Sequence, residues 1–363
     1  MKKNKNYVDL KDQPVPEGQH LLEVDDLKMY FHTEDGVVRA VDGVSYTLDR
    51  GETLGVVGES GSGKSVTAMT IMGLISMPPG KIEGGDVRYR GRSILEMTEE
   101  EMQHIRGNDI AMIFQDPMTS LNPVYKIGKQ VGEGLRLHRG YSKQEALKRA
   151  TELLDLVGIP EPEKRVNEYP HQFSGGMRQR VMIAMALACD PDILIADEPT
   201  TALDVTIQAQ IIELMQEMQE KNGNAIIMIT HDLGVVADMA DKIMVMYAGR
   251  PVEFGTAEEI FYESRHPYTW GLIRSIPEQA IDEKKPLTPI HGNPPSLMNL
   301  PEGCVFSPRC PYATDKCRKQ RPERVVTESG HYSACHYSGD PEFLKNAPDT
   351  SRTRKDSKKG GEA

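Results

Sequence analysis

The sequence has no run of apolar residues long enough to cross a membrane. Among its 363 residues, none of the hydrophobic stretches reaches the roughly 18 residues that a transmembrane helix requires. The first five residues are basic, but no apolar segment follows them, so they do not predict a secretory signal peptide. We therefore expect the chain to remain in the cytoplasm.

An excess of basic residues is also missing. The formal net charge is −11, whereas a nucleic-acid surface needs a basic patch or stripe, so the charge argues against nucleic acid as a partner. Hydrophobic residues make up 38% of the chain and charged residues 27%, which is ordinary for a soluble globular protein. The length allows one large domain with a smaller one, and no internal repeat is visible.

Cysteine is scarce and unevenly placed. Cys189 stands alone in an apolar segment that predicts core packing, and the other four thiols crowd the last sixth of the chain. Reduced thiols grouped in this way indicate a metal site rather than disulfides. Their C-x5-C-x6-C-x17-C spacing lacks the close pairs of structural zinc sites and favours an iron–sulfur cluster, with zinc or unliganded thiols as alternatives. His336 is a possible further ligand, although a surface histidine is the simpler interpretation. The four candidate ligands are Cys304, Cys310, Cys317 and Cys335.

Residues 58–65 spell a complete G-x-x-x-x-G-K-S loop. The loop follows an apolar run at 53–57 and precedes an apolar stretch at 66–75 that can be helical, which is the context of a phosphate-binding loop. Glycines let successive backbone N–H groups converge on an anion, and the helix N-terminus adds partial positive charge. We expect Lys64 on the β- and γ-phosphates and the Ser65 hydroxyl on Mg²⁺. The predicted ATP-binding residues here are Gly58, Ser60, Gly61, Ser62, Gly63, Lys64, Ser65 and Val66.

Two carboxylates end an apolar strand predicted at residues 193–196. Ligands of open α/β sheets bind at the carboxyl ends of strands, so Asp197 is placed to hold Mg²⁺. Glu198 can polarise the attacking water or accept its proton. A solvated acidic pair would be the simpler interpretation, but the phosphate loop upstream favours the catalytic one.

A second anion-binding signal lies at Ser174, Gly175 and Gly176, just before an apolar helix predicted at 181–188. One chain does not need two such sites for one triphosphate. Two chains facing each other would, because each could close the site of the other.

These motifs, in this order, resemble those of the ATP-binding subunit of ABC transporters over residues 21–260. Residues 58–65 are similar to the Walker A loop, 173–177 to the signature loop and 193–198 to Walker B with its catalytic glutamate. Residues 201–204 resemble the D-loop, and two single residues match the Q-loop glutamine and the switch histidine: Gln115 and His231.

The resemblance implies roles for several residues. Gln115 would coordinate Mg²⁺ and transmit motion to a helical insert, His231 would contact the γ-phosphate and the attacking water, and Phe31 would stack on adenine. Met177 stands where the family usually has glutamine, and a thioether cannot hydrogen-bond a ribose as an amide does. Residues implied to reach the nucleotide of a partner subunit are Ser174, Gly175, Gly176, Met177 and Asp204.

Further stretches resemble the D-type ATPase of oligopeptide/dipeptide importers, extending the likeness to about residue 340. They are residues 173–187, 266–269, 293–296 and 304–311. This resemblance implies a [4Fe–4S] site at the four cysteines, a second and different ATPase subunit, two permease subunits and an extracellular peptide-binding protein. It places the chain at the cytoplasmic face of the membrane, and nickel importers share much of the pattern.

The predicted fold is α/β: a P-loop NTPase of ABC type, with a RecA-like core, an antiparallel β subdomain and an inserted helical subdomain. We expect a leader at 1–20, the ATPase domain at 21–260 with its helical insert at about 98–172, a cysteine-containing extension at 261–340 and a disordered tail at 341–363. A soluble ABC ATPase acting on DNA or ribosomes is disfavoured, because there is one cassette and no room for a long coiled coil. An iron–sulfur electron carrier is disfavoured by Glu198 and His231.

Overall fold

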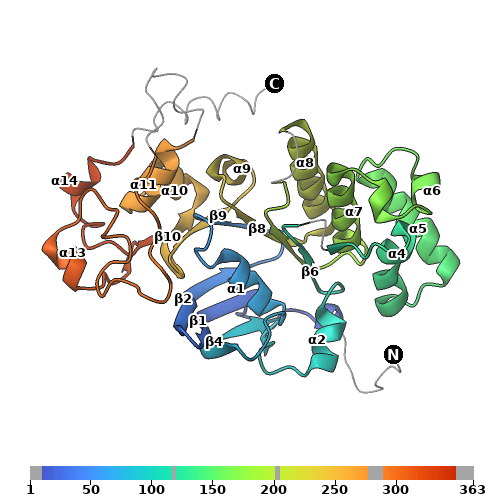
Figure 1. Ribbon diagram of the computed structural model, residues 1–363, viewed down its shortest axis with the longest axis horizontal. Helices are drawn as coiled ribbons and strands as arrows, with labels where there is room; N and C mark the ends of the chain where they lie inside the picture. Colours follow the sequence, from blue (N-terminus) through green and yellow to red (C-terminus); the bar gives the residue numbers. More distant parts are fainter. Residues whose placement is uncertain (1–9, 117–119, 201–204, 277–288, 349–363) are drawn as a thin grey trace.

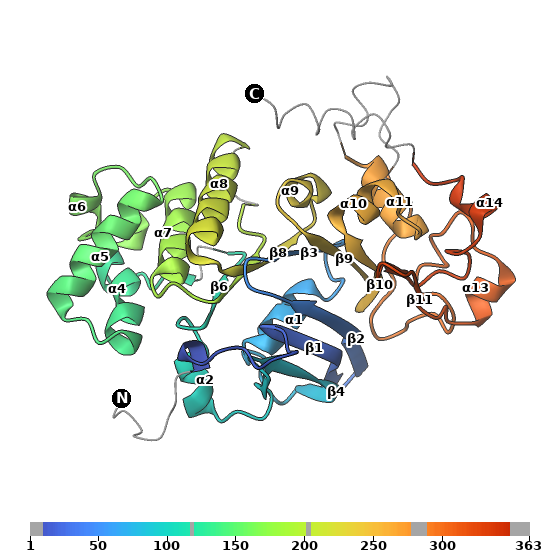
Figure 2. The same ribbon diagram turned by 180° about the vertical axis from the view of Figure 1, so that it is seen from behind.

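The structure is a computed structural model that describes residues 10–116, 120–200, 205–276 and 289–348. Figures 1 and 2 show two sheets at the centre of these residues, a helical lobe at one end and the C-terminal part at the other. Residues 201–204, the predicted D-loop with Asp204, lie outside the described residues, as do residues 1–9 and 349–363 of the predicted leader and tail.

The first layer is an antiparallel sheet with the strand order β2-β1-β4-β5. Its buried side chains share a hydrophobic cluster with α1 (Lys64–Ile71), while neighbouring residues along the strands stay exposed, as expected for a sheet with one solvated face. The strands are β1 (Leu22–Thr33), β2 (Gly36–Leu48), β4 (Gly80–Tyr89) and β5 (Arg92–Ser93).

The second layer, within the described ranges, is an eight-stranded sheet with the order β11-β12-β10-β9-β3-β8-β7-β6. The five neighbouring strands β9, β3, β8, β7 and β6 pair in parallel. At the β9 edge the sheet continues with the antiparallel strands β10, β12 and β11. β3, β7 and β8 are buried along their whole length, which explains their continuous apolar sequences. The bounds are β3 (Thr53–Val57), β6 (Ile110–Ile113), β7 (Ile193–Asp197), β8 (Ala225–Thr230), β9 (Lys242–Tyr247), β10 (Arg250–Thr256), β11 (Val325–Val326) and β12 (Tyr332–Ser333).

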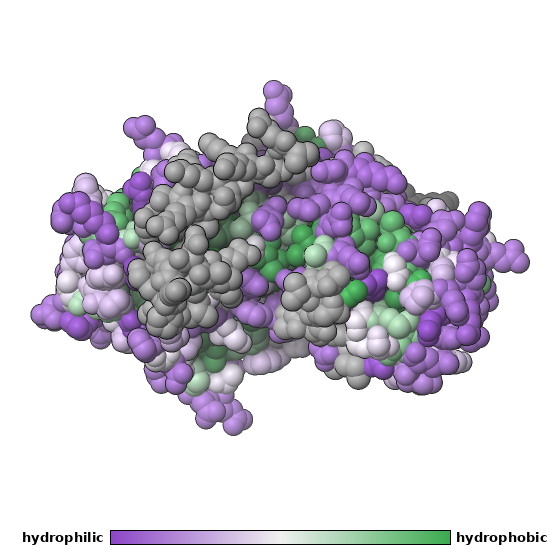
Figure 3. Space-filling model, turned by 90° about the horizontal axis from the view of Figure 1, so that it is seen from above, coloured by the Kyte–Doolittle hydropathy of each residue, from purple (hydrophilic) through white to green (hydrophobic). Residues whose placement is uncertain are grey.

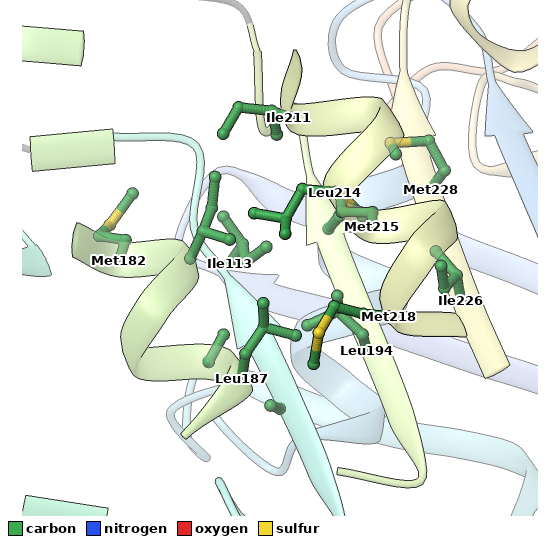
Figure 4. Packing of buried hydrophobic residues seen from close by; sticks show 14 of the residues in the cluster. Ile113, Met182, Leu187, Leu194, Ile211, Leu214, Met215, Met218, Ile226 and Met228 are labelled. Carbon is green, nitrogen blue, oxygen red and sulfur yellow. The ribbon is translucent and has the colours of Figure 1, made fainter. Parts of the chain in front are cut away.

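Two helices cover one face of the parallel strands. α7 (Gly175–Leu187) and α8 (Val205–Asn222) direct apolar side chains onto β6, β7 and β8. Figure 4 shows Leu187 of α7, with Leu214 and Met218 of α8, close to Leu194 of β7. This packing fixes β7, which ends at Asp197 just before Glu198, in its place in the sheet.

The helical lobe consists of α4 (Ile127–His138), α5 (Lys143–Leu156), α6 (Pro162–Arg165) and the 3-10 turn η2 (Pro170–Gln172), packed beside α7. A capping box starts α5, because the Ser142 hydroxyl accepts from Glu145 N–H while the Glu145 side chain accepts from Ser142 N–H. The predicted start of the helical insert near residue 98 is wrong. β6 pairs with β7 in the core sheet, and Met102 and Ile105 of α2 (Glu99–Ile105) are buried in the cluster of the β layer.

The C-terminal extension, residues 261–340, is continuous with the core rather than separate. β12 pairs with β10 of the large sheet, and α11 (Pro267–Arg274) buries Trp270. The predicted tail is ordered at its start, because the ring of Phe343 in α14 (Pro341–Leu344) packs against Trp270 at a tilt, with ring centroids 5.3 Å apart. The remaining described elements are η1 (Leu10–Asp12), α9 (Leu233–Ala237), α10 (Ala257–Tyr262) and α13 (Asp315–Lys319).

The predicted leader is also partly fixed. Leu10 is buried in the cluster of the β layer, and the Lys11 ammonium donates to the carbonyls of Cys189 and Asp190, just after the end of α7. The N-terminal part of the described chain therefore ties α7 to the β layer.

Hydrophilic residues dominate the outline of the face seen from above, and hydrophobic residues show between them in patches (Figure 3). Within the described ranges, none of the helices combines the length and the apolar character that a membrane crossing requires.

Candidate active site

The predicted phosphate loop connects β3 to α1, in the context that the sequence indicates. Two of its glycines have no room for a side chain: a Cβ on Gly58 would lie 2.2 Å from the Met246 carbonyl oxygen, and one on Gly63 would lie 2.3 Å from that of Ala40. Both have positive φ, at 151° and 101°. The loop therefore follows a close-packed path that glycine alone permits.

Lys64 is buried at the start of α1, and its ammonium donates to the carbonyls of Gly58 (2.6 Å) and Glu59 (3.1 Å). Burial lowers the pKa of Lys64, while the nearby Glu198, Asp197 and Glu59 act in the opposite direction. The lysine charge thus lies against the inner side of the loop, among three carboxylates.

The adjoining residue, Ser65, donates its hydroxyl hydrogen to Asp197 Oδ1 at 3.0 Å. Burial raises the pKa of Asp197, and the hydrogen bond from Ser65 opposes this rise. A hydroxyl and a carboxylate side by side at the carboxyl end of β7 are oxygen ligands of the kind that Mg²⁺ prefers.

Glu198, directly after β7, lies between two other predicted catalytic residues. Its Oε2 accepts from Gln115 Nε2 at 2.9 Å, and its Oε1 lies 3.3 Å from His231 Nδ1. Gln115 follows β6 and His231 follows β8, so three neighbouring parallel strands deliver the three side chains to one edge of the sheet. A carboxylate flanked by an amide and an imidazole can orient a water molecule and take its proton.

The backbone of Glu198 is held in an unusual conformation, with φ at +48°. Its N–H donates to the Ile229 carbonyl of β8 at 2.9 Å, which fixes the turn after β7. Left-handed backbone at a non-glycine residue costs free energy and is found preferentially at functional sites.

The signature residues lie at the start of α7, beside the helical lobe and apart from the phosphate loop. Ser174 caps α7 by accepting from Met177 N–H at 3.3 Å, and Met177 packs against the core. Phe173 is buried, which explains a large apolar residue there. In the described part of the chain, no hydrogen bond or ion pair joins residues 174–177 to residues 58–66. The structure thus does not unite the two anion-binding loops within one chain.

Phe31 lies on β1 opposite Val38 of β2 and is half-buried. The residues before and after it also carry aromatic rings, and both have polar partners. The Tyr30 hydroxyl donates to Asp42 at 3.0 Å, and His32 Nε2 lies 2.6 Å from Glu83 Oε1. Of the three, Phe31 is the one without a polar group, which suits stacking on a base.

The four C-terminal cysteines line one small cavity, which Phe306 and His336 also border. All five cysteines of the chain are free, and Cys189 is buried in the core as predicted. Burial raises the pKa of Cys304, that of Cys310 to about 11 and that of Cys335 to about 12.

Backbone N–H groups donate to three of these sulfurs, which lowers their pKa values against the effect of burial. The donors are Phe306 and Ser307 for Cys304, Tyr312 for Cys310 and Tyr337 for Cys335. Among the residues that the structure describes, no three His, Cys, Asp or Glu side chains form a group that could hold one metal ion. His336 Nε2 lies 2.9 Å from the Gln320 carbonyl oxygen.

Sequence reasoning missed several residues that hold the site together. Gln179 of α7 donates to the Pro199 carbonyl at 2.6 Å, immediately beyond Glu198. Arg309 and Tyr268 of the C-terminal extension contact Glu59 of the phosphate loop. Arg309 and Tyr268 stand within the stretches 304–311 and 266–269 that carry the resemblance, but the sequence gave no reason to connect them to Glu59.

Comparison with known proteins agrees with both parts of the chain. Residues 41–201 match the family described as "ABC transporter", and residues 252–317 match "Oligopeptide/dipeptide transporter, C-terminal region". The chain is 58% identical over 312 residues to the oligopeptide transport ATP-binding protein OppD of Bacillus subtilis, covering 86% of this chain and 87% of that protein. It is 52% identical to the dipeptide transport ATP-binding protein DppD of Escherichia coli, covering 87% and 96%.

A solved structure is similar to the ATPase part. It is the dimeric, post-hydrolysis state of an ATP-binding cassette bound to ADP and Pi, with 29% identity and a TM-score of 0.60 over 65% of this chain and 98% of that one. The predicted ABC-type fold is thereby confirmed. The chain belongs to the ATP-binding subunits of ABC transporters, in the oligopeptide/dipeptide branch, and it is an ATPase.

Proposed function

We propose that the chain is the ATP-hydrolysing subunit of a membrane importer for dipeptides or oligopeptides, working at the cytoplasmic face of the membrane. The observation that carries the ATP-hydrolysing part of this proposal is the position of Glu198 between Gln115 and His231, beside the phosphate loop. The names of the relatives, which are transport ATP-binding proteins for oligopeptides and dipeptides, support peptide rather than nickel as the cargo.

Each residue of the site has a task that its position supports. Lys64 leaves the loop carbonyls to bind the β- and γ-phosphates, and the loop N–H groups hold the phosphate oxygens. Ser65, Gln115 and Asp197 supply the oxygens that would hold Mg²⁺, which neutralises phosphate charge when bound. Glu198 activates the attacking water, and His231 contacts the γ-phosphate and orients that water. Phe31 stacks on adenine.

The separation of the two anion-binding loops supports hydrolysis in a dimer of ATPase subunits. The segment that begins α7 lies beside the helical lobe, where it can reach the nucleotide of a facing subunit; its residues are Ser174, Gly175, Gly176 and Met177. The likeness to a dimeric cassette structure agrees with this arrangement. The partner is a second ATPase subunit of a different chain, and Asp204 would contribute to the same interface.

A loop of the helical lobe is shaped to meet the permease subunits. Val124 is 71% exposed and Tyr125 is 44% exposed, an unusual display of apolar surface. The buried Gln130 fixes this loop by accepting from Asn122 N–H and donating to the carbonyls of Asn122 and Tyr125. We infer that the loop receives the cytoplasmic end of a permease subunit, in an assembly that contains two permease subunits and an extracellular peptide-binding protein.

We also propose an iron–sulfur cluster of the [4Fe–4S] type in the cysteine cavity. Four thiols converge there, and three sulfurs accept backbone N–H groups, which stabilise the thiolate form that binds metal. Among the described residues no three metal-binding side chains form a group that could hold one ion. The preference for a cluster over zinc therefore rests on the C-x5-C-x6-C-x17-C spacing, which lacks the close cysteine pairs of structural zinc sites. A cluster bound by all four thiols would supply a rigid link among the four segments that carry them.

Metal analysis after anaerobic purification tests the cluster. The parent protein should hold iron and acid-labile sulfide, and Cys317→Ser should lose both, whereas Cys189→Ser, in the core, should keep them. Stoichiometric zinc without iron would overturn the cluster in favour of the alternative ion.

Hydrolysis by the assembled complex tests the central proposal. Glu198→Gln should keep ATP binding and trap a stable dimer with bound ATP, because water activation is lost while the phosphate loop is intact. Equal hydrolysis by variant and parent complexes would contradict the role of Glu198. Uptake of peptides and of nickel by the parent complex, measured side by side, separates the two cargos.

A further inference from the structure

The C-terminal extension contacts the phosphate loop at Glu59. Arg309 forms a bidentate, charge-assisted ion pair with Glu59, donating from Nη1 to Oε2 at 2.5 Å and from Nη2 to Oε1 at 3.0 Å. The Arg309 side chain is 4% exposed and that of Glu59 is 30% exposed. The two residues are 250 positions apart, so only the folded chain unites them.

Arg309 is itself fixed in place. Its Nε donates to the His291 carbonyl at 2.9 Å, and Nη2 also donates to the Ile290 carbonyl at 3.1 Å. The guanidinium carbon lies 5.8 Å from the centre of the Tyr247 ring. With its donors engaged on several sides, Arg309 presents its charge to Glu59 without further ordering of the side chain.

The backbone of Glu59 is held by the same extension. Its N–H donates to the Tyr268 hydroxyl at 2.9 Å, and the Tyr268 ring is wedged between Tyr247 and Phe306, with centroids at 4.6 and 5.3 Å. The Glu59 carbonyl meanwhile accepts from Lys64. All three polar parts of Glu59 are therefore engaged, two of them by residues of the extension.

The charge of Glu59 matters because of what the loop binds. A carboxylate in a loop that cradles a triphosphate repels the ligand, and the effect is large where water is partly excluded. Glu59 also attracts Lys64, the cation that the phosphates need. An arginine paired with the carboxylate cancels the repulsion and releases Lys64 for the nucleotide.

The extension also meets the hairpin at the other end of the site. Arg39 N–H of β2 donates to the Leu297 carbonyl at 3.2 Å, on the strand opposite the one that carries Phe31. The C-terminal extension therefore contacts both the phosphate loop and the strand pair proposed to hold adenine.

We propose that Arg309 is a positioning residue for the ATPase reaction: it neutralises Glu59 and holds the phosphate loop ready for ATP. This inference rests on the proposed function of the site. It assigns the C-terminal extension a direct part in nucleotide binding, in addition to its cysteine cavity.

A set of variants in the complete transporter tests this role, with ATP hydrolysis and equilibrium ATP binding as readouts. Arg309→Met should raise the KM for ATP about tenfold and leave kcat within about twofold, because Glu198 and its partners are untouched. Glu59→Gln should change KM by no more than about twofold. Adding Glu59→Gln to Arg309→Met should restore KM to within about threefold of the parent, because no unpaired carboxylate is left.

The matched control is Arg318→Met, which removes a 58% exposed arginine paired with Asp315 in the same extension and should leave KM unchanged. A purely structural role for Arg309 predicts that the double variant is as impaired as Arg309→Met, and that result would overturn the proposal. An unchanged KM in Arg309→Met would overturn it as well. If Arg309→Met does not fold, Arg309→Lys replaces it, and a charge-neutralising role predicts a KM within about threefold of the parent. A parent complex without ATPase activity would instead contradict the proposed function, which keeps the two failures distinct.

Discussion

Removing the Asp192 carboxylate tests how the two sheets are joined beside the active site. Asp192 immediately precedes β7, and its side chain is 4% exposed. It accepts from Arg90 Nη2 at 2.5 Å, from Arg90 Nε at 3.1 Å, from the Tyr89 hydroxyl at 2.7 Å and from Arg50 Nη2 at 2.7 Å. Tyr89 is the last residue of β4 and Arg90 lies in the turn after it. This network of hydrogen bonds therefore links the β layer to the strand that carries Asp197.

The expected loss of stability follows from the burial of Arg90, whose side chain is 3% exposed. Burial alone would lower the pKa of Arg90, but its hydrogen bonds to Asp192 and Tyr89 raise it above its usual value. Taking one partner from a buried ion pair costs about 3–5 kcal/mol, because the other charge is left uncompensated. Since Arg90 also donates to the Gln13 carbonyl, we expect Asp192→Ala to fall near the lower end, about 3 kcal/mol.

Thermal and urea unfolding of the purified subunit measure this change. A loss of about 3 kcal/mol corresponds to a fall in Tm of about 4 °C for a chain of this size. The control is Arg50→Met, because the Arg50 side chain is 46% exposed and such a pair contributes about 1 kcal/mol or less. The double variant Asp192→Leu with Arg90→Met should recover much of the loss, since no charge is then left buried. An Asp192→Ala variant no less stable than Arg50→Met would show that the network does not hold the sheets together.

Three further variants address the active site. Lys64→Ala should weaken ATP binding by about tenfold or more by removing a charge-assisted contact, and an unchanged affinity in equilibrium titration would exclude that role. Asp197→Asn should abolish hydrolysis yet make the ATP-free subunit more stable. Because burial raises the pKa of Asp197, the folded protein loses stability as the pH rises from the usual aspartate pKa toward this raised pKa, and asparagine does not titrate. The gain should therefore disappear at acidic pH in unfolding measurements, and a pH-independent difference would contradict it. Gln179→Met should lower kcat severalfold with little change in KM, because it releases Pro199 beside Glu198; a normal kcat would show that this bond does not position the glutamate.

The predictions that succeeded rest on local rules. A glycine loop between an apolar strand and a helix start predicts a phosphate-binding loop. In the structure this loop turns at Gly58 and Gly63, where no side chain fits. Asp197 could be placed at the site because ligands bind at the carboxyl ends of parallel strands, and the structure brings Glu198 and His231 to the same edge. Cys189 was assigned to the core because it stands in an apolar segment, and it is buried just after the end of α7.

The predictions that failed concern boundaries and long-range contacts. Residues 99–113 read as part of a charged, helical stretch, yet Ile110–Ile113 is a strand because β7 offers an edge to pair with. Residues 341–344 read as part of a polar tail, but α14 inserts Phe343 among aromatic rings contributed by Trp270 and Tyr337. Local composition cannot reveal a partner that lies tens of residues away.

The sequence by itself determined the chemistry of this protein: a phosphate loop, a pair of carboxylates, a glutamine, a histidine and a second anion-binding turn, each defined by short runs of residue types. The tertiary structure decided how these parts are held, because hydrogen bonds and ion pairs depend on distance in space and not on separation along the chain. The contact of Arg309 with Glu59 and the gathering of four scattered cysteines around one cavity arise only when the C-terminal extension folds back onto the core sheet.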